Sequence, residues 1–184
     1  KFASNRPLFI GESVDRTVKF TDVNNASINQ MPAKYQMHQN AKHTNGIVLW
    51  YSKAVVDNMG NYGDMLRNTY WRYPALQPLM PFIDSHAPKK PRKLMVVNVN
   101  GERMLFWTAP KGKAWNDVAA KYVVYRFNTD ELINLNDPSK IVTVTYDNFC
   151  KLPYIDGKTK AVYVVTALDR MSNESKGKKK KIKL

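Results

Sequence analysis

The sequence predicts a chain in two parts, an α/β half followed by an all-β sandwich. Residues 8–71 alternate short apolar runs with segments of helical period, whereas from residue 94 onward apolar residues recur at every second position. Five of the ten prolines lie between Pro74 and Pro91. Proline lacks a backbone N–H and restricts the residue before it, so this stretch is expected to be neither helix nor central strand. We therefore predict two domains, 1–88 and 89–184.

The first half has the order strand, helix, strand, helix. The apolar run 8–11 predicts a buried parallel strand, and Pro32 suits the first turn of a helix that ends near residue 41. The run 47–51 predicts a second buried strand, and residues 62–71 a second helix. This is the order of parallel α/β proteins. Two strands do not complete such a sheet, so we expect the rest of it on a longer parent chain, or packing against the second domain or another subunit.

The second half predicts six or seven strands, which is typical of a β-sandwich. The expected strands lie near residues 94–97, 104–107, 122–127, 141–146 and 161–167, and the basic tail with Ile182 and Leu184 supplies a last one. The side chains expected to hold the core together are Trp107, Tyr122, Val124, Tyr163 and Val165.

Charge and composition exclude several classes of protein. A hydrophobic content of 43% excludes a wholly disordered chain, and no apolar run is long enough for a transmembrane helix. The net charge is +14, and six lysines fall in the last nine residues. Without a recognisable nucleic-acid-binding motif, we favour a solvated charged end and no specific nucleic-acid partner. Binding of nucleic acid or an anionic glycan by this tail is the alternative.

Residues that would bind a metal or cofactor do not form a recognisable pattern. Cys150 is the single cysteine, which excludes an internal disulfide, and we expect it to be a small buried hydrophobe. His38 and His43 are five residues apart, one more than the spacing that places two ligands on one helical face. Gly60-x-x-Gly63 lacks the lysine of a phosphate-binding loop. We therefore predict no metal and no cofactor.

Three motifs of the second half resemble bacterial fibronectin type III domains. The run YVVTALDR at 163–170, followed by NES at 173–175, is similar to their penultimate strand. Leu105-x-Trp107-x-x-Pro110 is similar to their second strand, and residues 122–126 to their third. These domains often carry a tyrosine where this chain has Ala161.

The first half and the proline segment resemble the bacterial glycosyl-hydrolase-like family 10. The motifs are Ile10-Gly11, GIVLWYS at 46–52, Asp57-Asn58 and YPALQPLMPFID at 73–84. The resemblance implies a TIM-like (β/α)₈ barrel that leads into a fibronectin type III domain. The chain begins with Lys1, and on this interpretation it holds the last two βα units of the barrel, with about six units upstream.

The resemblance also points to candidate site residues, because substrates of TIM barrels bind at the C-terminal ends of the strands. Glu12, after the first strand, is the candidate catalytic carboxylate, although the usual pair of carboxylates is expected on the missing strands. Trp50 and Tyr51 end the second strand, where an aromatic ring could stack on a sugar. Asp15 and Asn58 are candidates for hydrogen bonds to sugar hydroxyls; a loop acid, core aromatics and a helix cap are the structural alternatives.

The function that the sequence favours is therefore the C-terminal portion of a bacterial glycoside hydrolase with an accessory fibronectin type III module. The resemblance implies a carbohydrate substrate, no cofactor and an extracytoplasmic location, and we expect the fragment alone to be inactive. The alternative is a non-catalytic binding or scaffolding protein that works through the sandwich. An incomplete sheet in the first half would also allow self-association.

Overall fold

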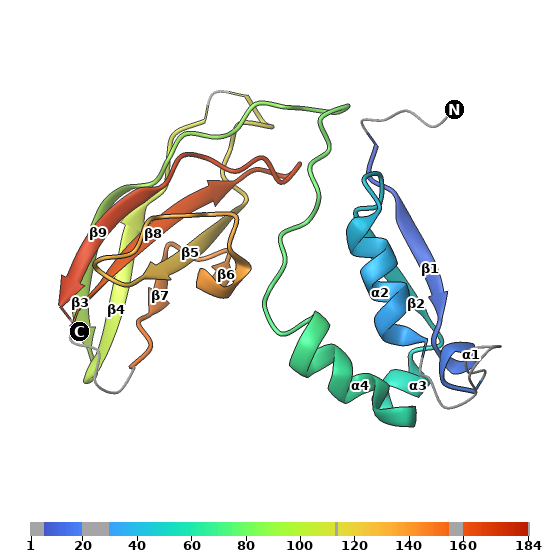
Figure 1. Ribbon diagram of the computed structural model, residues 1–184. Coiled ribbons are helices and arrows are strands. Elements are labelled where there is room, and N and C mark those ends of the chain that lie inside the picture. The colour runs from blue at the N-terminus through green and yellow to red at the C-terminus, as the bar shows by residue number, and fades with distance from the viewer. Residues whose placement is uncertain (1–5, 20–29, 113, 155–159, 184) are drawn as a thin grey trace. The chain divides into compact units, whose positions relative to one another are not determined.

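The computed structural model describes residues 6–19, 30–112, 114–154 and 160–183, and it consists mostly of β-sheet with a few short helices (Figure 1). The chain divides into two compact units, residues 1–73 and 74–184. No helix within the described ranges is long and apolar enough to cross a membrane.

The first unit contains a parallel pair of strands, β1 (Phe9–Ser13) and β2 (Gly46–Trp50). They are joined through α1 (Val14–Lys19) and α2 (Met31–Asn40), and Pro32 lies in the first turn of α2, where its missing N–H costs no hydrogen bond. The order of elements that the sequence predicts is therefore present.

Three short helical segments follow β2. These are α3 (Lys53–Val56), a 3₁₀ turn at Met59–Asn61 and α4 (Tyr62–Met65), which continues as a π-helical turn over Leu66–Tyr70. The predicted helix at 62–71 thus widens after its first turn, where the Trp71 N–H donates to the Leu66 carbonyl at 2.7 Å. Gly63 allows α3 and α4 to approach, because a Cβ at this position would lie 2.6 Å from the Val55 carbonyl oxygen.

The helices cover one face of the β1–β2 sheet. Between the helices and this face lies a hydrophobic core, against which Ile47 and Leu49 of β2 pack. Its buried residues are Val14, Met31, Tyr35, Ala54, Tyr62 and Leu66. On the other face, Phe9, Val48 and Trp50 are 45%, 54% and 73% exposed. The sequence predicts strands buried on both faces, and for the described residues of this unit that is wrong, because nothing in it covers the second face.

The second unit is a sandwich of two antiparallel sheets. One sheet has the order β3 (Arg92–Val99), β4 (Glu102–Thr108), β7 (Phe149–Lys151), and the other the order β6 (Ile141–Thr145), β5 (Lys121–Phe127), β8 (Lys160–Leu168), β9 (Lys178–Lys183). A 3₁₀ turn at Pro138–Lys140 precedes β6. Asn100 and Gly101, both at positive φ, form the tight β3–β4 hairpin. The predicted sandwich is present, and β7 is an additional strand that the sequence analysis did not predict.

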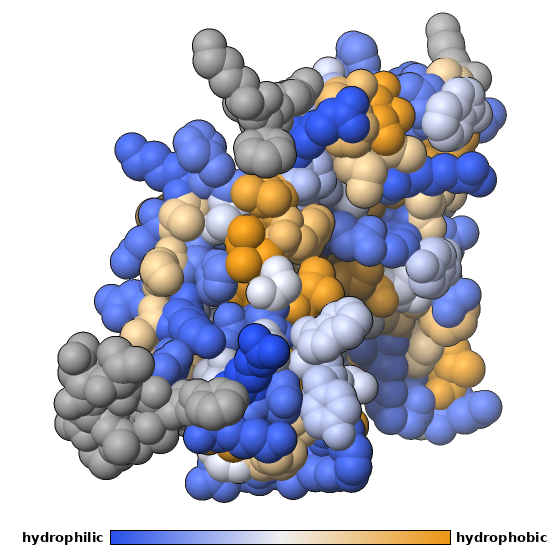
Figure 2. Space-filling view, turned by 90° about the vertical axis from the view of Figure 1, so that its right-hand side faces the viewer, coloured by the Kyte–Doolittle hydropathy of each residue, from blue (hydrophilic) through white to orange (hydrophobic). Residues whose placement is uncertain are grey.

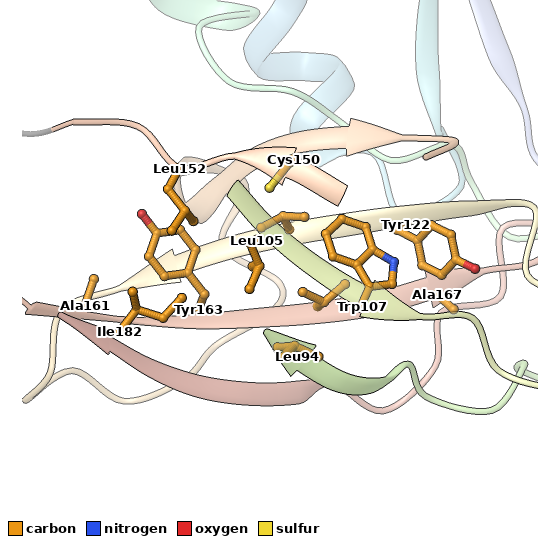
Figure 3. Close-up of a cluster of buried hydrophobic side chains, with 12 residues drawn as sticks. Leu94, Leu105, Trp107, Tyr122, Cys150, Leu152, Ala161, Tyr163, Ala167 and Ile182 are labelled. Atoms are coloured by element: carbon orange, nitrogen blue, oxygen red, sulfur yellow. The ribbon is translucent and has the colours of Figure 1, made fainter. Parts of the chain in front are cut away.

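The core between the two sheets contains all five side chains expected there. Figure 3 shows Trp107 next to Tyr122, and the two rings meet edge to face with centroids 5.4 Å apart. Cys150 of β7 is buried in the same cluster, and burial raises the pKa of its thiol to about 11. Ala161, at the position where the resemblance to fibronectin type III domains would lead one to expect a tyrosine, is fully buried in this cluster.

The four-stranded sheet is also covered on its outer face. Val123, Tyr125 and Phe127 alternate with the inward residues of β5 and are buried in a second cluster, against which Leu76 of the proline segment packs. Segment 74–88 has neither helix nor strand, as predicted, and it belongs to the second compact unit. The predicted domain boundary at residue 88 stays a prediction.

The basic tail forms the edge strand β9, in which Ile182 is buried and Lys179, Lys181 and Lys183 are exposed. Lysines on an edge strand oppose edge-to-edge pairing with other chains. Leu184, also expected in this strand, lies outside the described residues.

Candidate functional site

The candidate site lies at the C-terminal edge of the β1–β2 sheet. The two strands are parallel and in register, with Ser13 opposite Trp50, so both end at the same edge. Glu12, Trp50 and Tyr51 are therefore near one another at the strand ends, but the Glu12 and Trp50 side chains lie on opposite faces of the sheet.

Glu12 points to the side of the sheet that the helices cover. It is paired with Leu49, which packs in the helical core, and Glu12 itself is 8% exposed. The Lys34 ammonium of α2 lies 2.6 Å from Glu12 Oε1, and the Thr17 hydroxyl of α1 donates to the same oxygen. Lys34 also donates to Thr17 Oγ1 at 2.8 Å. One carboxylate oxygen thus already accepts two hydrogen bonds from the protein.

Two buried tyrosines extend this polar cluster. Burial raises the pKa of Tyr62 to about 12, and it raises that of Tyr35 further, so both hydroxyls stay protonated at neutral pH. The Tyr35 ring stacks on Tyr70 with centroids 4.3 Å apart. The Lys34–Glu12 pair ties β1 to α2, and the two tyrosines pack beside it in the helical core.

Trp50 and Tyr51 form an exposed aromatic pair. Trp50 lies on the face opposite the helical core, which no helix among the described residues of this unit covers. Tyr51 has a φ of 68°, in the left-handed region that non-glycine residues rarely adopt, and about half of its surface is exposed. This conformation turns the chain sharply from β2 into α3.

Asp15 and Asn58 are both engaged in local hydrogen bonds. Asp15 accepts from the Ser13 hydroxyl at 2.9 Å, which lowers the pKa of the Asp15 carboxyl. The Asn58 side-chain oxygen accepts a hydrogen bond from the Asp64 N–H at 2.9 Å, and the Asn58 amide donates one to the Asp64 carboxylate at 2.7 Å. Asn58 thus braces the turn before α4, while Asp15 remains partly exposed at the start of α1.

The structure brings Glu12 together with Lys34 and Thr17, and it separates Glu12 from Trp50. The sequence analysis did not identify Lys34 as part of the site. One signal for it was available, because Lys34 follows Met31 by three residues and lies beside Tyr35 on the buried side of α2. Among the described residues, no group of three or more His, Cys, Asp or Glu side chains is arranged to hold a metal ion.

Comparison with known proteins gives one curated relative. No family model matches the chain. The chain is 26% identical over 185 aligned residues to the glycosyl hydrolase YngK of Bacillus subtilis (strain 168). The alignment covers 97% of this chain and 35% of the relative, so the chain spans about a third of that protein's length.

Solved structures match over about half of the chain. The mutant of the fibronectin type III protein FN3tt matches 52% of this chain and 94% of its own, with 17% identity and a TM-score of 0.39. The Endo-D glycoside hydrolase domain from Streptococcus pneumoniae R6 matches 54% of this chain and 16% of its own, with 16% identity and a TM-score of 0.40. The spore cortex lytic enzyme SleM of Clostridium perfringens matches 53% of this chain and 28% of its own, with 12% identity and a TM-score of 0.38. All three TM-scores lie below 0.5, so the sandwich assignment rests on the strand pairing itself.

Proposed function

We propose that the chain is the C-terminal part of a carbohydrate-active hydrolase. In this proposal, the first unit supplies the last two βα units of a TIM-like barrel, and the second unit is a fibronectin type III-like accessory module. The observation that carries it is the uncovered face of the β1–β2 sheet.

That face has the character of a barrel interior. In a (β/α)₈ barrel the helices pack outside the strands, and the opposite face of every strand points inward. The helices described for the first unit cover one side of the sheet, whereas Phe9, Val48 and Trp50 are exposed on the other. Figure 2 looks onto the side where β1 and β2 lie in Figure 1, and apolar side chains are gathered along its middle. Further strands of a longer protein would pair with the free edges of β1 and β2 and enclose these side chains.

The alignment with a glycosyl hydrolase supports the same interpretation, because it runs through both units and covers only part of that relative. The barrel, and with it the family 10 assignment, is our proposal. Hydrolysis of a glycosidic bond would then need carboxylates on strands outside this chain, and the chain alone would be inactive. An extracytoplasmic location, implied by the resemblance, also stays a prediction.

Within this barrel we assign sugar binding to Trp50. It is the last residue of β2 and lies on the face of the strand that would point into the barrel. Its exposed indole offers a flat apolar surface to the C–H face of a sugar ring. Tyr51 and Asp15 adjoin this edge and stay proposed contacts. Glu12 stays a predicted catalytic residue, but its bonds to Lys34 and Thr17 favour a role in holding β1 against the helices. The hydrogen bonds of Asn58 likewise favour a structural role.

The test uses the longer natural protein and measures the release of reducing ends from a panel of neutral and acidic polysaccharides. We expect hydrolysis of at least one of them, and we expect Trp50→Ala to lower kcat/KM about tenfold or more, since it removes a stacking surface. Trp71→Ala is the matched control, because Trp71 is an exposed tryptophan of the same unit but follows the π-helical turn. No hydrolysis in any member of the panel, or equal effects of the two substitutions, would overturn the proposal.

A second candidate function is non-catalytic binding through the sandwich. It is favoured by the buried clusters on both faces of the four-stranded sheet, which make the second unit complete in itself. Self-association through the uncovered β1–β2 face stays a prediction, and sedimentation of the 184-residue chain as a monomer would contradict it.

A further inference from the structure

The second unit contains a cleft of about 880 Å³ that the proposed hydrolase site does not use. Four separate segments of this unit line it: the start of the proline segment, the loop before β5, the end of β6 and the turn after β8. Ligand-binding pockets in proteins commonly have volumes of about 300–1,000 Å³. The size of the cleft therefore suits a short oligosaccharide segment.

Two aromatic side chains line the cleft and remain largely exposed. Trp115 is 64% exposed and Tyr146 is 73% exposed, although side chains of this size are usually buried. The Lys121 ammonium lies 5.3 Å from the centroid of the Tyr146 ring, a cation–π contact that holds this ring in position. Aromatic rings in a hollow offer the apolar surface on which the C–H faces of sugars pack.

The charge of the cleft is positive. Lys121 and Arg170 line it, and neither has a carboxylate partner among the contacts of the described residues. The acidic lining residue, Asp169, is 3% exposed, and both of its carboxylate oxygens accept hydrogen bonds from the protein. It accepts hydrogen bonds from the Met171 and Asn173 N–H groups at 2.8 and 2.9 Å, and a further one from the Asn173 side-chain amide at 2.9 Å.

The lining residues are held by the frame of the sandwich. Lys121 is the first residue of β5, Tyr146 directly follows β6, and Arg170 lies in the turn that Asp169 braces. Leu76 fixes the wall that the proline segment contributes, because it packs against the buried cluster on the outer face of the sheet. Side chains that are already held in place lose little conformational entropy when a ligand binds.

We propose that this cleft is a second carbohydrate-binding site, which takes a glycan that bears carboxylate groups. Trp115 and Tyr146 pack against the sugar rings, while Arg170 and Lys121 bind the carboxylates, for which the planar guanidinium of arginine is well suited. The choice of a carbohydrate over another anion rests on the proposed function. The carboxylate follows from the two cations, neither of which has a carboxylate partner among the contacts of the described residues.

The test is calorimetric titration of the 184-residue chain with three probes: tetragalacturonate, the neutral cellotetraose and poly-L-glutamate. We expect tetragalacturonate to bind, with an affinity that falls as salt is added, and to bind at least about tenfold more tightly than cellotetraose. Trp115→Ala and Arg170→Gln should each weaken this binding about tenfold or more. The matched controls are Tyr154→Ala, an exposed aromatic outside the cleft lining, and Lys179→Gln on the edge strand, and both should bind like the unsubstituted chain.

Three results would overturn the proposal. These are the absence of tetragalacturonate binding, equal losses in the cleft and control variants, and poly-L-glutamate binding that is as tight and insensitive to Trp115→Ala. The last result would mean that the surface attracts anions of any kind. Failure here is distinguishable from failure of the hydrolase proposal: hydrolysis by the longer protein without glycan binding by this chain overturns the cleft alone, and binding without hydrolysis overturns the barrel alone.

Discussion

Asn173 connects the proline segment to the sandwich, and its replacement tests that connection. The side chain lies in the loop between β8 and β9 and is 6% exposed. Its amide donates one hydrogen bond to the Asp84 carbonyl at 3.1 Å and another to the Asp169 carboxylate at 2.9 Å. Asn173→Ala keeps the backbone but removes both bonds.

The expected loss follows from the two acceptors. A hydrogen bond to a neutral carbonyl contributes about 0.5–1.5 kcal/mol and one to a charged group about 1.5–3 kcal/mol. The site is buried, so water does not replace the lost donor at once. We therefore expect Asn173→Ala to lower the free energy of unfolding of the second unit by about 2–4 kcal/mol. Because the surface exposed on unfolding is nearly the same, the m-value should not change.

Urea unfolding of the full chain measures this loss, and hydrogen exchange of the β8 amides assigns it to the sandwich. Asn98→Ala is the matched control, because Asn98 is exposed on β3 and should lose less than about 0.5 kcal/mol. If Asn173→Ala costs no more than this control, the proline segment is not held by the contact described here, and its place in the second unit then rests on other contacts such as the packing of Leu76.

Four further predictions concern buried and partly buried contacts. Gly177→Ala should destabilise the sandwich by about 1–3 kcal/mol, because the new Cβ would overlap a methyl group of Val164, and its cost should shrink in a Val164→Ala background when both are measured by urea unfolding. Cys150 should react with iodoacetamide at pH 8 about 100-fold more slowly in the native chain than in urea, since burial raises the pKa of its thiol to about 11. Because that pKa is raised in the folded state, the stability linked to Cys150 is present below about pH 9 and falls as the pH rises toward 11, and Cys150→Ala should flatten this fall; an unchanged pH profile would contradict it. Lys34→Met should cost about 1–3 kcal/mol, less than for a fully buried pair because part of Lys34 is exposed, and a double-mutant cycle with Glu12→Gln should return a coupling energy above about 0.5 kcal/mol.

The sandwich could be predicted from the sequence to a large extent. Strands such as 122–127 and 161–167 contain apolar residues at alternate positions, and alternation is a local property that needs no knowledge of the partner strand. The sequence analysis did not predict the strand at 149–151, because three residues are too short for an alternating pattern to be recognised. Only its central cysteine is buried, and phenylalanine and lysine lie on the other side. Its pairing with β4 makes it a strand.

The burial of the outer face of the four-stranded sheet could not be predicted from the sequence, for a different reason. Tyr125 and Phe127 have the apolar character of core residues, but their position in the strand places them opposite the expected core. Their cluster is covered in part by Leu76, about fifty positions earlier in the chain, together with Leu135 and Ile141. No local pattern contains this contact.

For the candidate site, too, some features follow from the sequence and others only from the tertiary structure. By itself, the sequence determined the order of strands and helices in the first half, the two strand ends and the aromatic and acidic residues that follow them, because hydrophobic period and turn residues act over a few neighbouring positions. Only the tertiary structure decided that Glu12 faces the helices and Trp50 the uncovered side. The period of a strand separates its two faces but does not say which of them a helix will cover. That choice depends on contacts such as the one between Lys34 and Glu12, which are 22 residues apart.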